Sequence, residues 1–184
     1  MQTYIPDAFE YLPDKKIFLA RAGVRYSNVD DPEFLKRVNL LFLEALQYVS
    51  AKVWYDVFEI SHLKNEAVPS VFQGAKKITV FVSTLGKKLD EVIEERSKID
   101  LFESYILDAW GSEAVEKLNE SFDKKLREQF GRGTMRFSPG YGDIDIRLNK
   151  YFVKELLGVD EIDVLESGIL VPRKSTVCMI GWLE

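Results

Sequence analysis

Cysteine and histidine are almost absent from this chain: among 184 residues each occurs once, as Cys178 and His62. A single cysteine cannot form an internal disulfide, which agrees with a reducing compartment, so we expect a cytoplasmic protein. Cys178 lies in the apolar run 177–180, which predicts a buried, inert thiol rather than a nucleophile. Since zinc sites take most of their ligands from these two residue types, we expect no metal site.

Long apolar runs and a surplus of positive charge are missing as well. No stretch approaches the roughly 20 apolar residues that cross a bilayer, and no basic segment followed by an apolar one opens the chain. We therefore expect neither a membrane protein nor a secreted one. The 25 Lys and Arg residues are outnumbered by 30 Asp and Glu residues, for a formal net charge of −5. Proteins that follow nucleic acid phosphates normally carry a basic surplus, so nucleic acid is not an expected partner.

The sequence also lacks linkers and the common catalytic motifs. No repeat or Gly/Ser-rich segment divides it, so residues 1–184 are predicted to form one domain. It contains no Gly-x-x-x-x-Gly-Lys phosphate loop and no Gly-x-Ser-x-Gly nucleophile turn. Gly131-x-Gly133 follows an expected helix and lacks the third glycine of a dinucleotide fingerprint. We therefore assign no catalytic residue.

The spacing of the apolar residues predicts an α+β fold. A helix is expected to start at Asp30 or Asp31, with Pro32 in its first turn. Further helices are expected over 87–97, over 99–130 (one long or two broken) and over 146–157, and strands over 53–60, 78–82, 134–137, 162–165 and 176–182. Because helices and strands interleave without a regular βαβ period, we expect a mainly antiparallel, twisted sheet with flanking helices.

The most informative segment spans residues 136–143 and reads Arg-Phe-Ser-Pro-Gly-Tyr-Gly-Asp. Pro139 fixes φ at about −65°, and Gly140 can adopt the positive φ that a type II turn requires. Arg136 offers a planar fork of donors suited to a carboxylate or phosphate, and Tyr141 offers a flat face and a hydroxyl. Physical chemistry alone indicates a candidate loop for an anionic ligand. An ordinary tight turn with a surface arginine and a packed tyrosine is the alternative.

Three ordered motifs carry a resemblance to a known family. Arg136-x-x-x-Gly140-Tyr141 is followed by Val-Leu-Glu-Ser at 164–167 and by Val-Pro-Arg-Lys-Ser at 171–175. Together with the upstream run 81–86, this order resembles the activation domain of vitamin B12-dependent methionine synthase, in a free-standing form. The resemblance is strongest over residues 78–182.

The resemblance implies a binding site for S-adenosylmethionine. Its residues would be Arg136, Ser138, Gly140 and Tyr141, with Ser138 contributing through its main chain. Around this site or at its rim, the resemblance and the charge of the ligand suggest Glu113, Glu166, Pro172, Lys174 and Ser175. We expect Arg136 and Tyr141 to lie in a surface groove, with the loop 172–175 at its rim.

The function implied by the resemblance is that of a reactivation module. Such a module presents the methyl donor for reductive methylation of cob(II)alamin on a separate B12-dependent methionine synthase that lacks its own activation domain. A flavodoxin-like protein would supply the electron, and cobalamin would be held only by the partner. Acting in trans, the chain would be an accessory component of that methyltransferase. Two alternatives are a non-enzymatic binding or assembly module that has lost the ligand, and a reactivation partner of another corrinoid methyltransferase.

Overall fold

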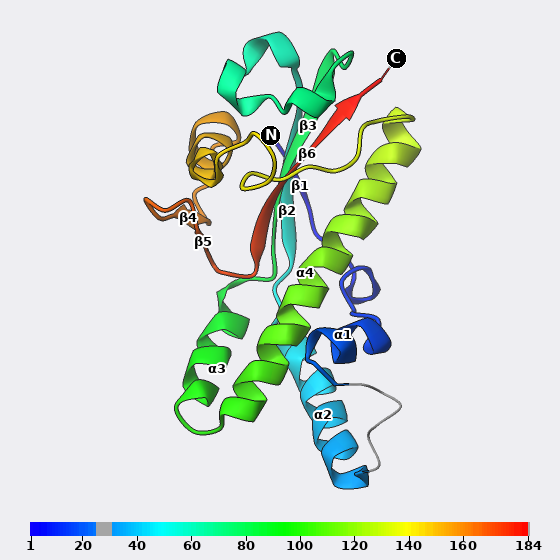
Figure 1. Cartoon of the computed structure of the whole chain (residues 1–184), viewed down its shortest axis with the longest axis vertical. Helices are drawn as coiled ribbons and strands as arrows, with labels where there is room; N and C mark the ends of the chain where they lie inside the picture. The colour runs from blue at the N-terminus through cyan, green and yellow to red at the C-terminus, as the bar shows by residue number, and fades with distance from the viewer. Residues whose placement is uncertain (25–30, 184) are drawn as a thin grey trace.

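The centre of the molecule is a four-stranded antiparallel sheet. The computed structural model describes residues 1–24 and 31–183. Each neighbouring pair of strands is antiparallel, and Figure 1 shows the strands running along the long axis of the molecule. In spatial order the strands are β1 (Gln2–Tyr4), β2 (Lys52–Glu59), β3 (Lys77–Thr84) and β6 (Ser175–Trp182). The predicted α+β class with a mainly antiparallel sheet and flanking helices is confirmed.

The central strand β3 is covered on both faces. Its residues 78–84 are all buried. Phe81 packs with Cys178 in one apolar cluster, whereas Val80 packs with Met179 in another. Since successive side chains of a strand point to opposite faces, the two clusters lie on opposite sides of the sheet.

Helix α4 (Leu101–Phe130) covers one face of the sheet. It is one continuous helix, which settles the choice between one long and two broken helices over 99–130. The Asp100 carboxylate caps its start by accepting hydrogen bonds from two main-chain N–H groups, and Gly131, with φ of 81°, ends it. Apolar residues such as Trp110 and Phe122 fill the first cluster beneath it.

Three shorter helices pack around α4, in the lower half of Figure 1. They are α1 (Lys15–Arg21), α2 (Pro32–Ala45) and α3 (Lys87–Ser97). The expected bounds of α3 are confirmed. Asp31 caps α2, because its carboxylate accepts hydrogen bonds from two main-chain N–H groups at 2.9 and 3.2 Å. Asp30, the other residue considered for this role, lies outside the described residues.

The opposite face is covered by short, irregular elements. The helix expected over 146–157 is a 3-10 turn (Ile146–Leu148) followed by a π-helix (Tyr151–Leu156) that ends before Gly158, with φ of 63°. The three consecutive residues 151–153 are buried, and a wide π-turn can direct more neighbouring side chains toward the sheet than a regular α-turn does. The remaining 3-10 turns of the described chain are Ala8–Glu10, Leu46–Tyr48, Ile60–His62, Asn65–Ala67 and Ser70–Phe72.

One expected strand is shorter than predicted, and another is not formed. The strand over 162–165 is reduced to β4 (Asp163–Val164), paired with β5 (Leu170–Val171). The strand over 134–137 is replaced by two single bridges to β6, at Gly133 and Phe137. Between them, the Arg127 side chain of α4 donates hydrogen bonds to main-chain carbonyls of residues 133 and 134. Those carbonyls are thereby bonded to the helix rather than to the sheet.

Candidate functional site

The segment 136–143 forms the tight turn that its sequence predicts. The Tyr141 N–H donates to the Ser138 carbonyl at 3.3 Å, which closes the turn. Gly140 has φ of 93°, as the second central residue of a type II turn requires. The Gly140 N–H donates a hydrogen bond to the Ile144 carbonyl at 2.8 Å, which also fixes the turn to the segment that follows it. Pro139 is buried, while Tyr141 is 72% exposed and stands at the surface.

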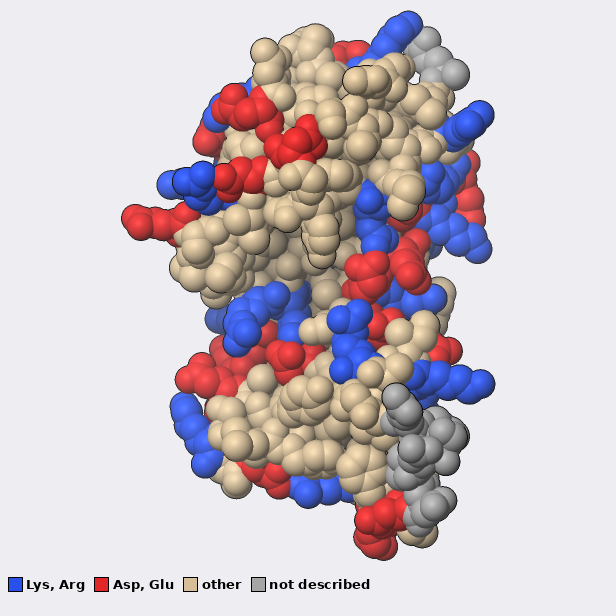
Figure 2. All heavy atoms as spheres, in the orientation of Figure 1, with Lys and Arg blue, Asp and Glu red and all other residues tan. Residues whose placement is uncertain are grey.

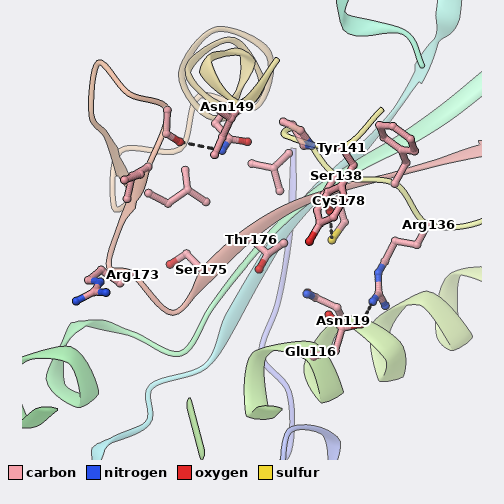
Figure 3. A pocket seen from close by; sticks show the side chains of 17 residues that line it. Glu116, Asn119, Arg136, Ser138, Tyr141, Asn149, Arg173, Ser175, Thr176 and Cys178 are labelled. Carbon is pink, nitrogen blue, oxygen red and sulfur yellow. Dashed lines mark hydrogen bonds and ion pairs between the residues drawn. The ribbon is translucent and has the colours of Figure 1, made fainter. Parts of the chain in front are cut away.

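A cavity of about 620 Å³ lies beside this turn. Figure 2 shows the surface of this face hollowed at mid-height, with basic and acidic side chains gathered around the hollow. Figure 3 shows the side chains that line the cavity, which come from α4, the turn, the start of β6, the 3-10 turn and the β4–β5 hairpin. Of the predicted site residues, the cavity walls contain Arg136, Ser138, Tyr141 and Ser175.

Glu116 of α4 and Arg136 form an ion pair in the cavity wall. The Arg136 side chain is only 18% exposed, whereas the Glu116 side chain is 43% exposed. The pair places a fixed cation and a carboxylate side by side (Figure 3). Sequence reasoning missed Glu116. No local signal singled it out, because Ser112 and Asp123, one turn before Glu116 and two turns after it on the same side of α4, are polar as well.

Two buried asparagines also line the cavity, and neither was predicted. Asn119 accepts a hydrogen bond from the Ser83 hydroxyl at 2.5 Å, and its Nδ2 has no hydrogen-bond partner among the described residues. Asn149 follows the 3-10 turn and donates from Nδ2 to the Gly168 carbonyl at 2.9 Å. Its Oδ1 is likewise buried and unpaired in the described part of the chain.

The edge of β6 is open next to the turn. Met179 exchanges both main-chain hydrogen bonds with Phe137, so its N–H and C=O point away from β3. Every second residue of an antiparallel strand directs these groups the same way, so Val177 also points its N–H and C=O away from β3. Val177 lines the cavity, and no backbone hydrogen bond between described residues takes up these groups. They form a main-chain edge for a flat ligand with donors and acceptors along its rim.

Cys178 lies at the floor of the cavity as a protonated thiol. It is fully buried, and its Sγ lies 3.5 Å from the Ser138 hydroxyl oxygen. Burial raises the pKa of the Cys178 thiol to about 12, although the nearby charge of Arg136 acts in the opposite direction. The expectation of a buried thiol is confirmed. With so high a pKa the group is no nucleophile near neutral pH.

Four of the suggested surrounding residues lie away from this cavity. Glu113 lies elsewhere on α4, where its carboxylate accepts a hydrogen bond from Arg21 at 2.9 Å. Glu166 is exposed in the turn between β4 and β5 and does not line the cavity. Pro172 lines a second cavity, of about 1020 Å³, between α3 and α4.

Lys174 is directed toward α4. Its side chain is 9% exposed, and its ammonium donates to Asp108 at 2.7 Å and to the Ser112 hydroxyl at 2.9 Å. The loop 172–175 therefore borders the cavity through Arg173 and Ser175, with the lysine acting as an anchor.

Neither a metal centre nor a membrane span stands out in the part of the chain that the structure describes. No group of three or more His, Cys, Asp or Glu side chains there is placed to hold a metal ion. Over the same residues, no helix combines the length and the apolar character needed to cross a bilayer.

Comparison with known proteins shows a shared fold. The structure aligns with that of the MetH reactivation domain bound to AdoHcy, with a TM-score of 0.71 over 98% of this chain and 78% of that chain. The chain has the reactivation-domain fold. Sequence identity to that domain is 14%, and neither a protein-family model nor a curated protein sequence matches the chain. The likeness covers nearly the whole chain, so it includes residues before 78, where the sequence motifs gave no support.

Proposed function

We propose that this chain binds S-adenosylmethionine, or its demethylated product S-adenosylhomocysteine, in the cavity beside β6. The observation that carries the proposal is the Arg136–Glu116 pair in the cavity wall. Both ligands end in an amino acid group with one carboxylate and one ammonium. Arg136 matches the carboxylate with a planar fork of donors, and Glu116 lies beside it for the ammonium. S-adenosylmethionine adds a positively charged sulfur, which the same carboxylate would attract.

The remaining walls suit a nucleoside. The flat face of Tyr141 provides a surface on which a base can stack. The Ser138 main chain and the open edge at Val177 offer donors and acceptors to the rim of the base. A volume of about 620 Å³ falls within the usual range for small-ligand sites. The fold shared with a domain that binds AdoHcy supports the same class of ligand.

We propose further that the site presents the methyl group to a corrinoid on another protein. An external donor, for example a flavodoxin-like protein, would first give one electron to cobalt(II) of the partner's cobalamin. The resulting cobalt(I) electron pair would attack the methyl carbon, while the C–S bond breaks and its electrons stay on sulfur. S-adenosylhomocysteine would remain in the cavity. The sulfonium needs no acid or base, so this chain would contribute position rather than proton transfer.

The openness of the site supports a reaction in trans. Tyr141 is 72% exposed, and the cavity reaches the surface as the hollow in Figure 2. A methyl donor held there is accessible to a second macromolecule. We therefore propose that the chain acts as an accessory component of a B12-dependent methionine synthase that lacks its own activation domain.

A reconstitution experiment tests this role. Purified chain, S-adenosylmethionine, a reductant and a cob(II)alamin-loaded methionine synthase fragment should together yield methylcobalamin, followed by its absorption spectrum. Omitting the chain should abolish the product. Arg136→Ala should suppress it, and Arg132→Ala, a matched change at an exposed arginine outside the cavity, should not.

The alternatives are separate outcomes of the same set of measurements. If the chain binds the ligand but methylcobalamin forms only on another corrinoid methyltransferase, the partner protein differs from the one proposed, and the proposed binding site is retained. A chain that binds no S-adenosylmethionine would be a binding or assembly module with the same fold, and the proposal would be wrong.

A further inference from the structure

Asn149 holds an unpaired hydrogen-bond acceptor at the cavity. Asn149 is only 7% exposed, and its Nδ2 donates a hydrogen bond to the Gly168 carbonyl. A carbonyl can only accept, so this bond fixes which end of the amide is nitrogen and leaves Oδ1 as the other end. Oδ1 is buried without a partner among the described residues, and Figure 3 shows it on the side of the Asn149 amide away from the dashed hydrogen bond. Buried polar atoms are nearly always paired in native proteins, so this oxygen indicates a missing partner.

The position of this oxygen is set by backbone rather than by mobile side chains. Gly168 has φ of 88°, and a Cβ there would lie 2.4 Å from the Ile146 carbonyl oxygen. The hairpin turn and the 3-10 turn therefore touch through main-chain atoms, and only glycine allows the contact. The Gly168 N–H in turn donates to the Leu165 carbonyl at 2.8 Å. Asn149, which lines the cavity, is held across this contact, so the position of its amide group is set by the backbone.

Asn149 lies at the end of the cavity away from the charged pair. In Figure 3 it stands apart from Arg136 and Glu116, on the side of the β4–β5 hairpin. Leu170 and Ile169 line the wall on this side. If the proposed ligand binds with its amino acid group at Arg136 and Glu116, its nucleoside extends toward Asn149. The hydrogen-bond donors of this nucleoside are the adenine amine and the ribose hydroxyls.

We propose that Asn149 is a specificity-determining residue that accepts a hydrogen bond from a donor on the nucleoside end of the ligand. The inference rests on the proposed function of the cavity. An amide oxygen can only accept hydrogen bonds, so its partner must be an amine or a hydroxyl. It stays unpaired when the ligand lacks that donor. Ligands without the donor are therefore bound more weakly, as in other sites that read a hydrogen-bonding group.

Analogues of S-adenosylhomocysteine test the inference by titration calorimetry. One analogue carries hydrogen in place of the adenine amine, which removes the donor without adding bulk, and two others lack the 2′ or the 3′ hydroxyl. With the unaltered chain, one of the three should bind at least about fivefold more weakly than the parent ligand. The analogue that binds more weakly identifies which ligand group, the adenine amine or one of the two hydroxyls, donates the hydrogen bond to Asn149.

The same titrations with Asn149→Ala complete a double-mutant cycle, in which one change is made in the protein and the other in the ligand. The parent ligand and the affected analogue should then differ by less than about twofold, because the oxygen that told them apart is gone. Asn149→Leu also lacks the acceptor oxygen but keeps the volume of the side chain, so it should lose the discrimination as well and covers the case in which the alanine variant does not fold. Asn39→Ala is the matched control, since Asn39 also has a buried unpaired oxygen but lies on α2, outside the cavity.

Each outcome decides between distinct conclusions. Equal binding of all analogues by the unaltered chain, or full discrimination by Asn149→Ala, would overturn the role of Asn149 while leaving the ligand site in place. Absence of S-adenosylhomocysteine binding to the unaltered chain would overturn the proposed function, and this inference with it.

Discussion

Arg136 and Glu116 form the ion pair on which the proposed binding of a zwitterionic ligand depends. The two side chains come from different elements, the segment before the turn and the middle of α4. A largely buried guanidinium without a partner would be costly, and the Glu116 carboxylate offsets that cost. An amino acid ligand brings one charge of each sign, so it can exchange partners with the pair without leaving either charge alone.

Removing the charge of Glu116 should therefore change the preference between ligands. We expect Glu116→Gln to weaken binding of S-adenosylmethionine more than binding of S-adenosylhomocysteine, because only the former has a positively charged sulfur. A loss of at least about threefold in the ratio of the two affinities corresponds to a modest surface electrostatic contribution. Titration calorimetry with both ligands measures the ratio, with Glu120→Gln, on the same helix but outside the cavity, as the control. An unchanged ratio would contradict the role given to Glu116.

The Cys178 thiol should resist alkylation in the folded protein. Burial raises its pKa to about 12, so the folded state keeps the proton that the unfolded chain loses near the ordinary value of 9.0. The folded state binds more protons over this interval, so the free energy of unfolding should fall as pH rises from about 9 to about 12. Labelling with iodoacetamide at about pH 9, followed by mass spectrometry, should be slow in buffer and fast in denaturing urea. Rapid labelling of the native protein would mean that the thiol is accessible.

At the scale of the elements, the site depends on how the loop before β6 is fastened. Lys174 is buried against α4. Its side chain passes so close to Gly111 that a Cβ at that position would lie 3.0 Å from Cε of Lys174. This close approach brings Arg173 and Ser175, its neighbours in the chain, to the cavity wall. The lysine thus positions the loop from the side of α4.

Lys174→Ala should loosen this loop. Loss of the hydrogen bonds to Asp108 and Ser112 is expected to lower the free energy of unfolding by about 1–3 kcal/mol, measured by urea denaturation. Binding of S-adenosylhomocysteine should weaken as well, because the wall at residues 173–175 is no longer held. Lys87→Ala, at an exposed lysine of α3, should change neither quantity. Wild-type stability and binding in Lys174→Ala would show that the loop is held by other contacts.

Local sequence signals predicted the regular elements and the turn, but not the arrangement across elements. The cap at Asp31, the bounds of α3 and the positive φ of Gly140 follow from short-range rules of capping and turn chemistry. The irregular helix after Asn149 does not, since the sheet decides which of its side chains are buried.

The difference is sharpest on α4. Glu113 and Glu116 are both glutamates on one helix, and their spacing alone does not say which faces β6. The structure places Glu116 beside Arg136 and pairs Glu113 with Arg21. Lys174 likewise reads as a loop cation, and only the packing of the loop on α4 shows that it is an internal anchor.

At the scale of the whole molecule, the first third of the chain completes the structure on which the site is built. β1 and β2 supply half of the strands of the main sheet, and α1 and α2 add side chains such as Phe18 and Leu41 to the cluster under α4. The cavity itself lies at the other edge of the sheet, where β6 is only partly paired. The cavity therefore lies at the edge of the sheet formed by β6, on the opposite side of the sheet from β1.

The most direct test of this account is a calorimetric titration of the purified chain with S-adenosylhomocysteine. The account predicts saturable binding at one site per chain, and a loss of roughly 1.5–3 kcal/mol, or at least about tenfold in affinity, for Arg136→Ala. Arg136→Lys should restore part of the loss, since it keeps the charge without the planar fork, and Arg132→Ala should bind as the parent does. No measurable binding, or equal binding by Arg136→Ala and the unaltered chain, would contradict the proposal that this cavity holds the methyl donor.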